Sequence, residues 1–219
     1  MTIAAVIPNW NNGPWLERAL KSVFSQTVAV EEVIVVDGRS TDSSREVASR
    51  FPVRWMDAER KGQADARNVG IRATACDLIL PLDSDDWIEP AYVERCLPKF
   101  EDLKVGVAAP GLRWPDGRIQ WPVPPFTVEA LRTGNRLFCC SMFRRRCWEE
   151  VGGYSTAKTY EDLLLWLEIA ARGWKIEMVM EPLFHYCPHD RGSTARMESG
   201  AHQRYVEHVQ RRAGELIGI

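Results

Sequence analysis

The chain has 219 residues, of which 45% are hydrophobic and 26% charged, a size typical of one folded domain or two at most. Its net charge of −2 argues against a general binder of nucleic acid or anionic membranes, because such proteins need an excess of Lys and Arg. The composition also excludes collagen-like, disordered and disulfide-scaffold proteins.

Strands and helices are predicted to alternate along the first 82 residues. Short apolar runs that end at a proline or an aspartate are typical of buried strands, and apolar residues at helical spacing lie between them. The predicted strands are 3–7, 33–36, 53–56 and 78–82, and the predicted helices are about 14–24, 40–49 and 64–75. This alternation predicts a Rossmann-like α/β fold, with a mainly parallel sheet flanked by helices on both faces.

After about Pro110 the pattern changes. The segment 114–126 carries four prolines and is predicted to be a loop or an excursion at the sheet edge, because its aromatic side chains need burial. A strand at 137–143, a helix at 160–172, strands at 176–180 and 183–186, and a C-terminal helix at about 197–217 complete the predicted elements.

Polar residues follow three of the early strands. They are Pro8-Asn9, Asp37 and the run Asp83-Ser84-Asp85-Asp86. Ligands of open α/β sheets bind outside the carboxyl ends of the strands, so these three groups are expected to meet in space.

The acidic run places three carboxylates within four residues. Carboxylates this close repel one another unless a cation lies among them, and oxygen ligands of this kind suit Mg²⁺ or Mn²⁺. The alternative is a turn, since Asp and Ser are common in turns and at helix starts. The position after an apolar strand favours the metal interpretation.

Six segments, in order, carry a resemblance to a known family. They read VIPNWNNGPWLERALKSVFSQT, EEVIVVDGRSTDSS, GQADARNVGIRATACDLILPLDSDDWIEP, FRRRCWEEVGGY, YEDLLLWLEIAARGWKI and HYCPHDRGSTAR. With these segments the chain resembles family 2 glycosyltransferases of the GT-A fold, over nearly its whole length. The resemblance implies a single domain, 1–219, with a nucleotide-sugar donor half at 1–110. It also implies an acceptor half at 111–219, with a smaller β extension and the C-terminal helix.

The resemblance also implies donor and metal contacts. The donor-binding residues would be Pro8, Asn9, Asp37, Arg67, Asp83 and Ser84. The metal ligands would be Asp85 and His189, with Asp86 as an alternative to Asp85. Gly38 stands where the family often has a second acid, which weakens the inference that the base is uridine. Arg67 could instead be a surface arginine paired with Asp65.

On the acceptor side the resemblance implies that Asp162 is the general base, since it belongs to the Glu-Asp pair of the family. An acidic first helical turn is the alternative. The predicted acceptor-binding residues are Trp121, Arg145, Gly153, Tyr154 and Glu161. The glycines at 152 and 153 could equally end a helix.

The predicted function is metal-dependent, inverting transfer of a single sugar from a nucleotide sugar, expected to be a UDP-sugar, to an acceptor hydroxyl. The sequence has neither the membrane helices nor the Q-x-x-R-W motif of processive synthases. The alternatives are a nucleotidyltransferase and a sugar-nucleotide-binding protein without catalysis. The acceptor stays open between a glycan, a lipid carrier, a protein and a modified nucleobase.

The start of the chain lacks the charged and apolar regions of a secretory signal, and the six cysteines form no C-x-x-C pair. A cytoplasmic protein with reduced thiols is therefore expected, which could also lie at a membrane surface. The oligomeric state is not predicted.

Overall fold

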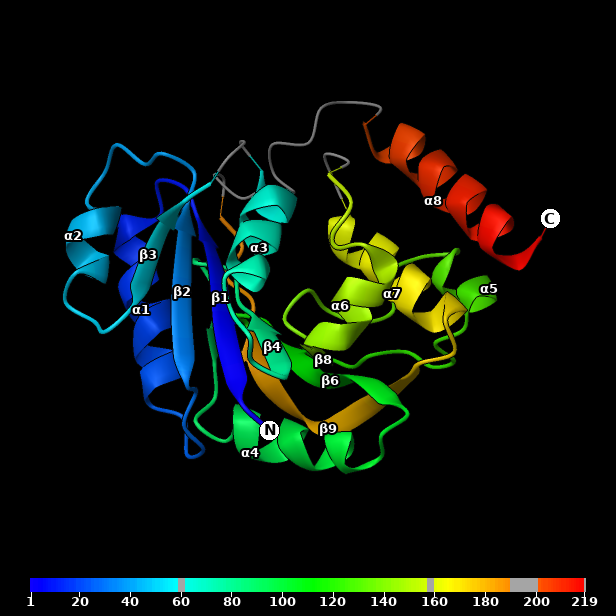
Figure 1. Cartoon of the computed structure of the whole chain (residues 1–219), viewed down its shortest axis with the longest axis horizontal. Helices are drawn as coiled ribbons and strands as arrows, with labels where there is room; N and C mark the ends of the chain where they lie inside the picture. The colour runs from blue at the N-terminus through cyan, green and yellow to red at the C-terminus, as the bar shows by residue number, and fades with distance from the viewer. Residues whose placement is uncertain (59–61, 157–159, 190–200, 219) are drawn as a thin grey trace.

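The computed structural model describes residues 1–58, 62–156, 160–189 and 201–218. Within them a mixed nine-stranded sheet crosses the molecule in the order β3-β2-β1-β4-β8-β6-β9-β5, and β7 pairs with β6 (Figure 1). The strands are β1 Ile3–Asn9, β2 Glu32–Asp37, β3 Arg54–Asp57, β4 Leu78–Pro81, β5 Trp87–Ile88, β6 Val105–Arg113, β7 Ile119–Gln120, β8 Met142–Arg144 and β9 Lys175–His185. The helices are α1 Gly13–Phe24, α2 Ser44–Ala48, α3 Gln63–Arg72, α4 Tyr92–Cys96, the 3₁₀ turn Leu97–Glu101, α5 Val128–Leu131, α6 Arg145–Val151, α7 Glu161–Ala171 and α8 Ala201–Ile217.

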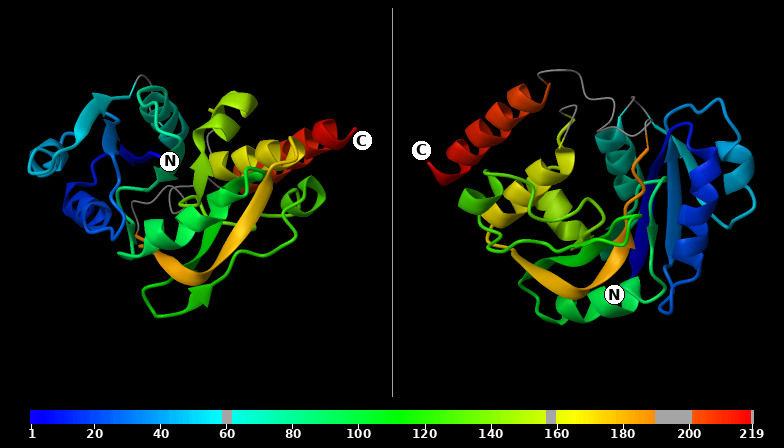
Figure 2. Two further views of the ribbon diagram at one scale, coloured as in Figure 1. Left: turned by 60° about the horizontal axis from the view of Figure 1, so that its bottom comes forward. Right: turned by 180° about the vertical axis from the view of Figure 1, so that it is seen from behind.

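The first four strands form the predicted parallel sheet, and their side chains alternate between its two faces. Ala5 and Ile7 of β1 pack on one face in a core cluster with Leu16 and Leu20 of α1. Val6 points to the other face, which α3 covers. Helices therefore lie on both faces of this part of the sheet, as the alternating pattern predicts (Figure 2).

Gly70 of α3 allows that helix to lie directly on the sheet. A Cβ atom at position 70 would lie 2.5 Å from Val6 Cγ1 and 3.1 Å from Val36 Cγ2. We expect Gly70→Ala to lower the free energy of unfolding by about 1–3 kcal/mol, the usual cost of overpacking a core. Urea denaturation measures the effect, and Val6→Ala in the same chain should recover part of it. If the two losses of unfolding free energy simply add in the double variant, the clash of the new methyl group is relieved by residues other than Val6.

The second half of the sheet is mixed rather than parallel, since β8 runs antiparallel to both β4 and β6. Strand β6 is central and almost wholly buried, yet the sequence pattern did not predict it. Gly106, Pro110 and Gly111 interrupt its apolar run, and its pairing with β9 shifts register beside Pro110 and Gly111. Strand β9 is one strand of 11 residues, where two shorter strands were predicted.

The later helices cover the α3 side of the sheet, and α8 packs against α7 and α5 (Figures 1 and 2). Val209 and Ala213 of α8 are buried in the same core cluster as Trp166, and Arg212 Nε donates to Glu168 at 2.6 Å. The predicted C-terminal helix is confirmed from Ala201, and residues 197–200 lie outside the described residues. Among the described helices, none combines the length and apolar character that crossing a membrane requires.

Helix α6 was not predicted as a helix, but its end was. Gly152 takes a left-handed conformation, with φ of 84°, at the C-cap of α6. Its N–H and that of Gly153 donate to Glu149 and Trp148 carbonyls. The helix-end interpretation of the two glycines is thus confirmed.

Candidate active site

The polar groups that follow β1, β2 and β4 meet at one end of the parallel sheet, as predicted. Asn9 Nδ2 donates to Asp37 Oδ1 at 2.8 Å, which joins the ends of β1 and β2. Asn12 Nδ2 donates to Ser84 Oγ at 2.9 Å, which joins the loop after β1 to the acidic run. Parallel pairing in register produces this convergence, because it sets the carboxyl ends of adjacent strands side by side.

Asp37 and Asn9 form a buried polar pair. Asp37 Oδ2 accepts the backbone N–H of Ser40 at 2.7 Å, and Asn9 is only 4% exposed. The side-chain oxygen Oδ1 of Asn9 is buried and has no hydrogen-bond partner within the described residues. A buried acceptor without a donor is costly, so this oxygen is ready to accept from a ligand.

The three acids of the run Asp83-Ser84-Asp85-Asp86 have different partners. Asp83 Oδ1 accepts from Arg67 at 2.5 Å, and Asp85 Oδ2 pairs with His189 Nε2 at 2.7 Å. Asp86, which is 1% exposed, accepts the backbone N–H of Cys187 at 2.8 Å. The segment 187–189 therefore closes over the run on the side of α1, where Trp15 stacks on His189.

Burial and mutual repulsion act on these acids. Burial and the charge of Asp83 raise the pKa of the Asp85 carboxyl. Burial, then Asp85 and Asp83, raise the pKa of Asp86 well above its usual range. A divalent cation would relieve this repulsion, so the ligand set fits the predicted Mg²⁺ or Mn²⁺.

The residues that could surround a cation differ in part from the predicted ones. Asp83, Asp86 and Cys139 offer ligand atoms that all lie within 4.8 Å of one another. Asp85 and His189 were the predicted ligands, and the structure pairs them with each other. Asp86 was the predicted alternative, and it belongs to the three-residue group.

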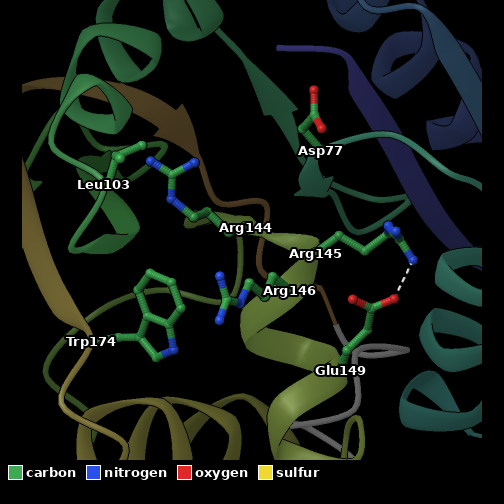
Figure 3. Close-up of a pocket in the computed structure, with 7 residues that line it drawn as sticks. All are labelled: Asp77, Leu103, Arg144, Arg145, Arg146, Glu149 and Trp174. Atoms are coloured by element: carbon green, nitrogen blue, oxygen red, sulfur yellow. Dashed lines mark hydrogen bonds and ion pairs between the residues drawn. The ribbon is translucent and has the colours of Figure 1, made fainter.

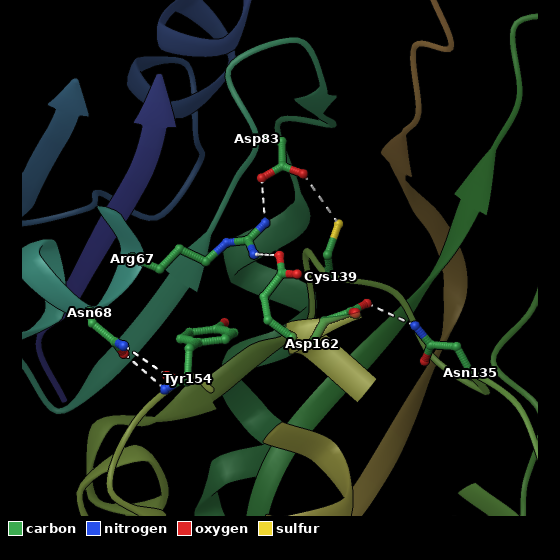
Figure 4. Close-up of polar contacts among 8 residues, drawn as sticks. Arg67, Asn68, Asp83, Asn135, Cys139, Tyr154 and Asp162 are labelled. Carbon is green, nitrogen blue, oxygen red and sulfur yellow. Dashed lines mark hydrogen bonds and ion pairs between the residues drawn. The ribbon is translucent and has the colours of Figure 1, made fainter. Parts of the chain in front are cut away.

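Arg67 joins the acidic run to the start of α7 (Figure 4). Its side chain is almost completely buried, with Nη2 2.5 Å from Asp83 Oδ1 and Nη1 2.5 Å from Glu161 Oε1. The surface interpretation of Arg67 is therefore wrong. The two carboxylates hold the guanidinium fork from both sides, which fixes the distance between the donor acids and the Glu-Asp pair.

Asp162 lies beside this bridge at the start of α7. Its Oδ2 accepts from Asn135 Nδ2 at 2.8 Å, and Figure 4 shows both side chains. Burial, followed by the neighbouring charge of Glu161, raises the pKa of Asp162 to about 6, although Arg67 and Asn135 act in the opposite direction. A carboxylate of this kind is ionised at neutral pH yet basic enough to accept a proton.

Tyr154 packs against Arg67, whose guanidinium lies over the Tyr154 ring at 5.4 Å from the ring centroid. Asn68 holds Tyr154 in this position. Its Oδ1 accepts from Tyr154 N and Trp148 Nε1, and its Nδ2 donates to Tyr154 O. At Gly153, with φ of 96°, a Cβ would come within 2.9 Å of Asn68 Oδ1. The Tyr154 hydroxyl is buried and has no partner in the described part of the chain.

Arg145 does not lie at this end of the sheet. Its backbone N–H donates to Asp77 O before β4, whereas Asp83 follows β4, and six extended residues span about 20 Å. Its guanidinium pairs with Glu149 beside a cavity of about 290 Å³ (Figure 3). The cavity is lined by Asp77, Leu103, Arg144, Arg145, Arg146, Glu149 and Trp174. This position does not support the predicted acceptor role of Arg145.

Trp121 follows β7 and packs against β6. Its ring covers Gly111, where a Cβ would come within 2.8 Å of the ring, and the side chain is 36% exposed. The end of β6 pairs with β9 at His185, and His185 pairs with Trp87, next to the acidic run. Trp121 thus packs against the carboxyl half of β6, and its acceptor contact stays a prediction.

Two side chains of the site were not predicted from the sequence. Cys139 Sγ lies 3.8 Å from Asp83 Oδ2, and Asn135 holds Asp162. Both belong to the irregular segment between α5 and β8. The strand predicted at 137–143 forms only from Met142, and no motif marks Asn135 or Cys139. Only the folded chain brings this segment between the acidic run and α7.

The sequence profile of Glycosyl transferase family 2 matches residues 4–152, well over half of the chain. The chain therefore belongs to this family of glycosyltransferases, and its sheet flanked by helices is the GT-A fold. Residues 4–152 include the acidic run and Arg67 but end before Asp162.

Individual proteins agree with this assignment. The chondroitin synthase of Escherichia coli is 29% identical over 166 residues, which cover 70% of this chain and 24% of that protein. The structure of TarS residues 1–349 from S. aureus in complex with UDP-GlcNAc superposes with a TM-score of 0.78 at 15% identity, covering 99% of this chain and 70% of that one. The mannosyltransferase PcManGT of Pyrobaculum calidifontis, in complex with GDP-Man and Mn²⁺, superposes with a TM-score of 0.69 at 20% identity. The match covers 88% of this chain and 59% of that one. The chain spans about a third or less of the length of the first curated relatives that it matches.

Proposed function

We propose that this chain transfers a single sugar from a UDP-sugar to an acceptor hydroxyl, with inversion at the anomeric carbon and with Mn²⁺ or Mg²⁺ as the cofactor. The observation that carries the proposal is the double ion pair of Arg67 with Asp83 and Glu161. It sets the acidic run, where a nucleotide diphosphate would bind, beside Asp162, the candidate base. One site thus holds the two kinds of groups that such a transfer requires.

The nucleotide would bind along the strand ends. The Asn9 Oδ1 acceptor and the Asp37 carboxylate suit the N–H groups of a base, and Pro8, which precedes Asn9 in β1, is a proposed donor contact beside them. Asp83 and Ser84 would face the ribose. TarS, whose fold this chain shares, has been crystallised with UDP-GlcNAc, which supports a UDP-sugar as the donor.

Asp85, Asp86 and His189 would hold the cation against the diphosphate. When bound, the cation neutralises the negative charge that develops on the leaving diphosphate. The Mn²⁺ in the PcManGT complex and the crowded acids of this chain both support a divalent cation. The chain's own contribution is to keep three carboxylates at one strand end, which parallel pairing and the segment 187–189 accomplish.

On the acceptor side, Asp162 would take the proton of the attacking hydroxyl, and Asn135 would orient its carboxylate. Tyr154, whose buried hydroxyl has no partner among the described residues, stays a proposed acceptor contact, while Glu161 positions Arg67. Trp121 is a proposed outer contact, and Arg145 is left out because of its position. The identity of the acceptor, glycan, lipid carrier, protein or nucleobase, is not part of the proposal.

Calorimetry with UDP tests the donor and metal parts together. We expect UDP to bind in the presence of Mn²⁺, and to bind at least tenfold more weakly in EDTA, because the diphosphate would then face uncompensated carboxylates. Asp85→Ala should show the same weakness with Mn²⁺ present. Asp116→Ala, an exposed carboxylate in the turn before β7, is the control. Equal affinity in all conditions would remove the metal from the proposal.

A further inference from the structure

A cavity of about 290 Å³ lies at the opposite end of the sheet from the donor site (Figure 3). Asp77 in its wall precedes β4, whereas the acidic run follows β4. The residues that line the cavity include three arginines, Arg144, Arg145 and Arg146, against two acids. We propose that this cavity is a second binding site, which holds the phosphate group of an organic phosphate. The inference goes beyond sugar transfer and does not depend on it.

Arg144 supplies a positive charge that is fixed in place but not offset by an acid. Its Nε donates to Val105 O at 2.8 Å, its Nη2 donates to Phe100 O at 2.6 Å, and its guanidinium lies 5.3 Å from the centroid of the Phe100 ring. Nη2 also donates to the backbone carbonyl of Asp102, whose carboxylate pairs with Lys175 at 2.9 Å. Carbonyl oxygens satisfy N–H groups without cancelling a full charge. Among the described residues Arg144 has no carboxylate partner, so its charge is available to an anion.

The two acids that line the cavity already have partners. Glu149 pairs with Arg145, and Figure 3 shows both side chains on the opposite side of α6 from Trp174. Asp77 Oδ2 accepts the backbone N–H of Thr2 at 2.8 Å. The anion is therefore expected on the Trp174 side of α6, where Arg145 does not reach.

Arg146 adds a second guanidinium on the Trp174 side. Its side chain is 73% exposed, and its Nε donates to Glu150 Oε1 at 2.7 Å. The Nη1 and Nη2 groups have no acceptor within the described part of the chain, and the guanidinium lies 5.8 Å from the centroid of the Trp174 ring. Exposed ion pairs four residues apart on a helix contribute little to stability, so Arg146 can turn toward a ligand at small cost.

The chemistry of the walls indicates the class of ligand. A guanidinium presents N–H groups in a fork that matches the oxygens of a phosphate. A phosphate monoester carries a charge of about −1.5 to −2 at neutral pH, which suits the two cations Arg144 and Arg146. Trp174 and Leu103 supply apolar surface beside them, and Leu103 is 78% exposed. The carbon skeleton of an organic phosphate can cover this surface, which inorganic phosphate leaves in water.

Phenyl phosphate is the probe, titrated by calorimetry into the full chain in EDTA. We expect one saturable equivalent, with an affinity about fivefold or more above that of inorganic phosphate, because the ring buries apolar area. Benzoate has the same ring but a single charge, and it should bind about fivefold or more weakly than phenyl phosphate. In a second titration, saturating UDP with Mn²⁺ should leave the affinity for phenyl phosphate unchanged, since the donor site is elsewhere.

Exposed positions give the decisive variants. Arg146→Met should weaken phenyl phosphate about tenfold, the usual effect of losing a charged hydrogen bond. Leu103→Ser should bring its affinity close to that of inorganic phosphate. Arg50→Met is the matched control, because Arg50 forms the same kind of exposed pair with Glu46, at the end of α2. Its affinity should equal that of the wild type.

Arg144→Gln should abolish binding. Because Arg144 also holds three backbone carbonyls, circular dichroism and thermal melting must first show that this variant is folded. If it does not fold, Arg146→Met and Leu103→Ser still test the site, since both side chains are exposed.

A sedimentation assay identifies the source of the phosphate. It compares phosphatidylcholine vesicles with and without phosphatidic acid. Binding that Arg146→Met weakens and Arg50→Met does not supports the site, with calorimetry indicating a soluble phosphate and vesicles indicating a lipid head group.

Four results would overturn the proposal: no binding in either assay, equal losses in Arg146→Met and Arg50→Met, equal affinity for benzoate, or displacement of phenyl phosphate by UDP. Because no titration uses a sugar donor, such a failure would leave the proposed transfer reaction untouched.

Discussion

Asp162→Asn should lower the turnover of sugar transfer by about 10²–10⁴, the usual contribution of a general base, and leave UDP affinity unchanged. The amide keeps the shape and can still accept from Asn135, but it cannot take the proton of the acceptor hydroxyl. Once a donor is known, steady-state transfer to an acceptor or to water measures the loss, and calorimetry with UDP measures donor binding.

The pH dependence of the wild type gives an independent check on the same residue. The pKa of Asp162 is raised to about 6, so turnover should fall as the pH is lowered through about 6, where the base becomes protonated. This limb should be absent from the residual activity of the asparagine variant.

Two controls separate the base from other roles of an acid at a helix start. Glu129→Gln removes an exposed acid from the first turn of α5 and should leave turnover unchanged. The melting temperature of Asp162→Asn should equal or exceed that of the wild type, because ionising a buried carboxyl with a raised pKa costs folding free energy above that pKa. Full turnover in Asp162→Asn would show that this acid only complements the helix dipole.

Arg67→Met should be among the most destabilising single substitutions in this chain. Arg67 is 1% exposed and pairs with two largely buried carboxylates, Asp83 and Glu161. Removing one partner of a buried ion pair typically costs about 3–5 kcal/mol, since the remaining charge keeps its desolvation cost without compensation. Urea denaturation at neutral pH measures the loss of unfolding free energy.

Arg72→Met is the matched control, because Arg72 is exposed on the last turn of the same helix. It should change stability by no more than about 0.5 kcal/mol. A loss below about 1 kcal/mol would mean that water or a rearranged side chain replaces the bridge.

The sequence by itself determined the parallel half of the sheet and the ends of its strands. Apolar runs closed by Pro8, Asp37 or Asp83 are local signals, and parallel pairing then forces the residues after them together. The Glu161-Asp162 pair and the C-cap glycine Gly152 are local signals too, since a helix start and a helix end have their own residue preferences. For this reason the acidic run, Asn9 and Asp37 were found without coordinates.

Only the tertiary structure decided the contacts between distant segments. Arg67 could be assigned to a donor or to the surface from its motif, and the 94 residues that separate it from Glu161 carry no sign of their ion pair. Strand β6 escaped prediction because Gly106, Pro110 and Gly111 are tolerated where bulges and close packing are needed. Arg145 was assigned to the acceptor side by proximity in sequence, but antiparallel pairing of β8 with β4 carries it to the opposite end of the sheet. Cys139 reaches the acids through an irregular segment, whose path is set by packing and not by any local pattern.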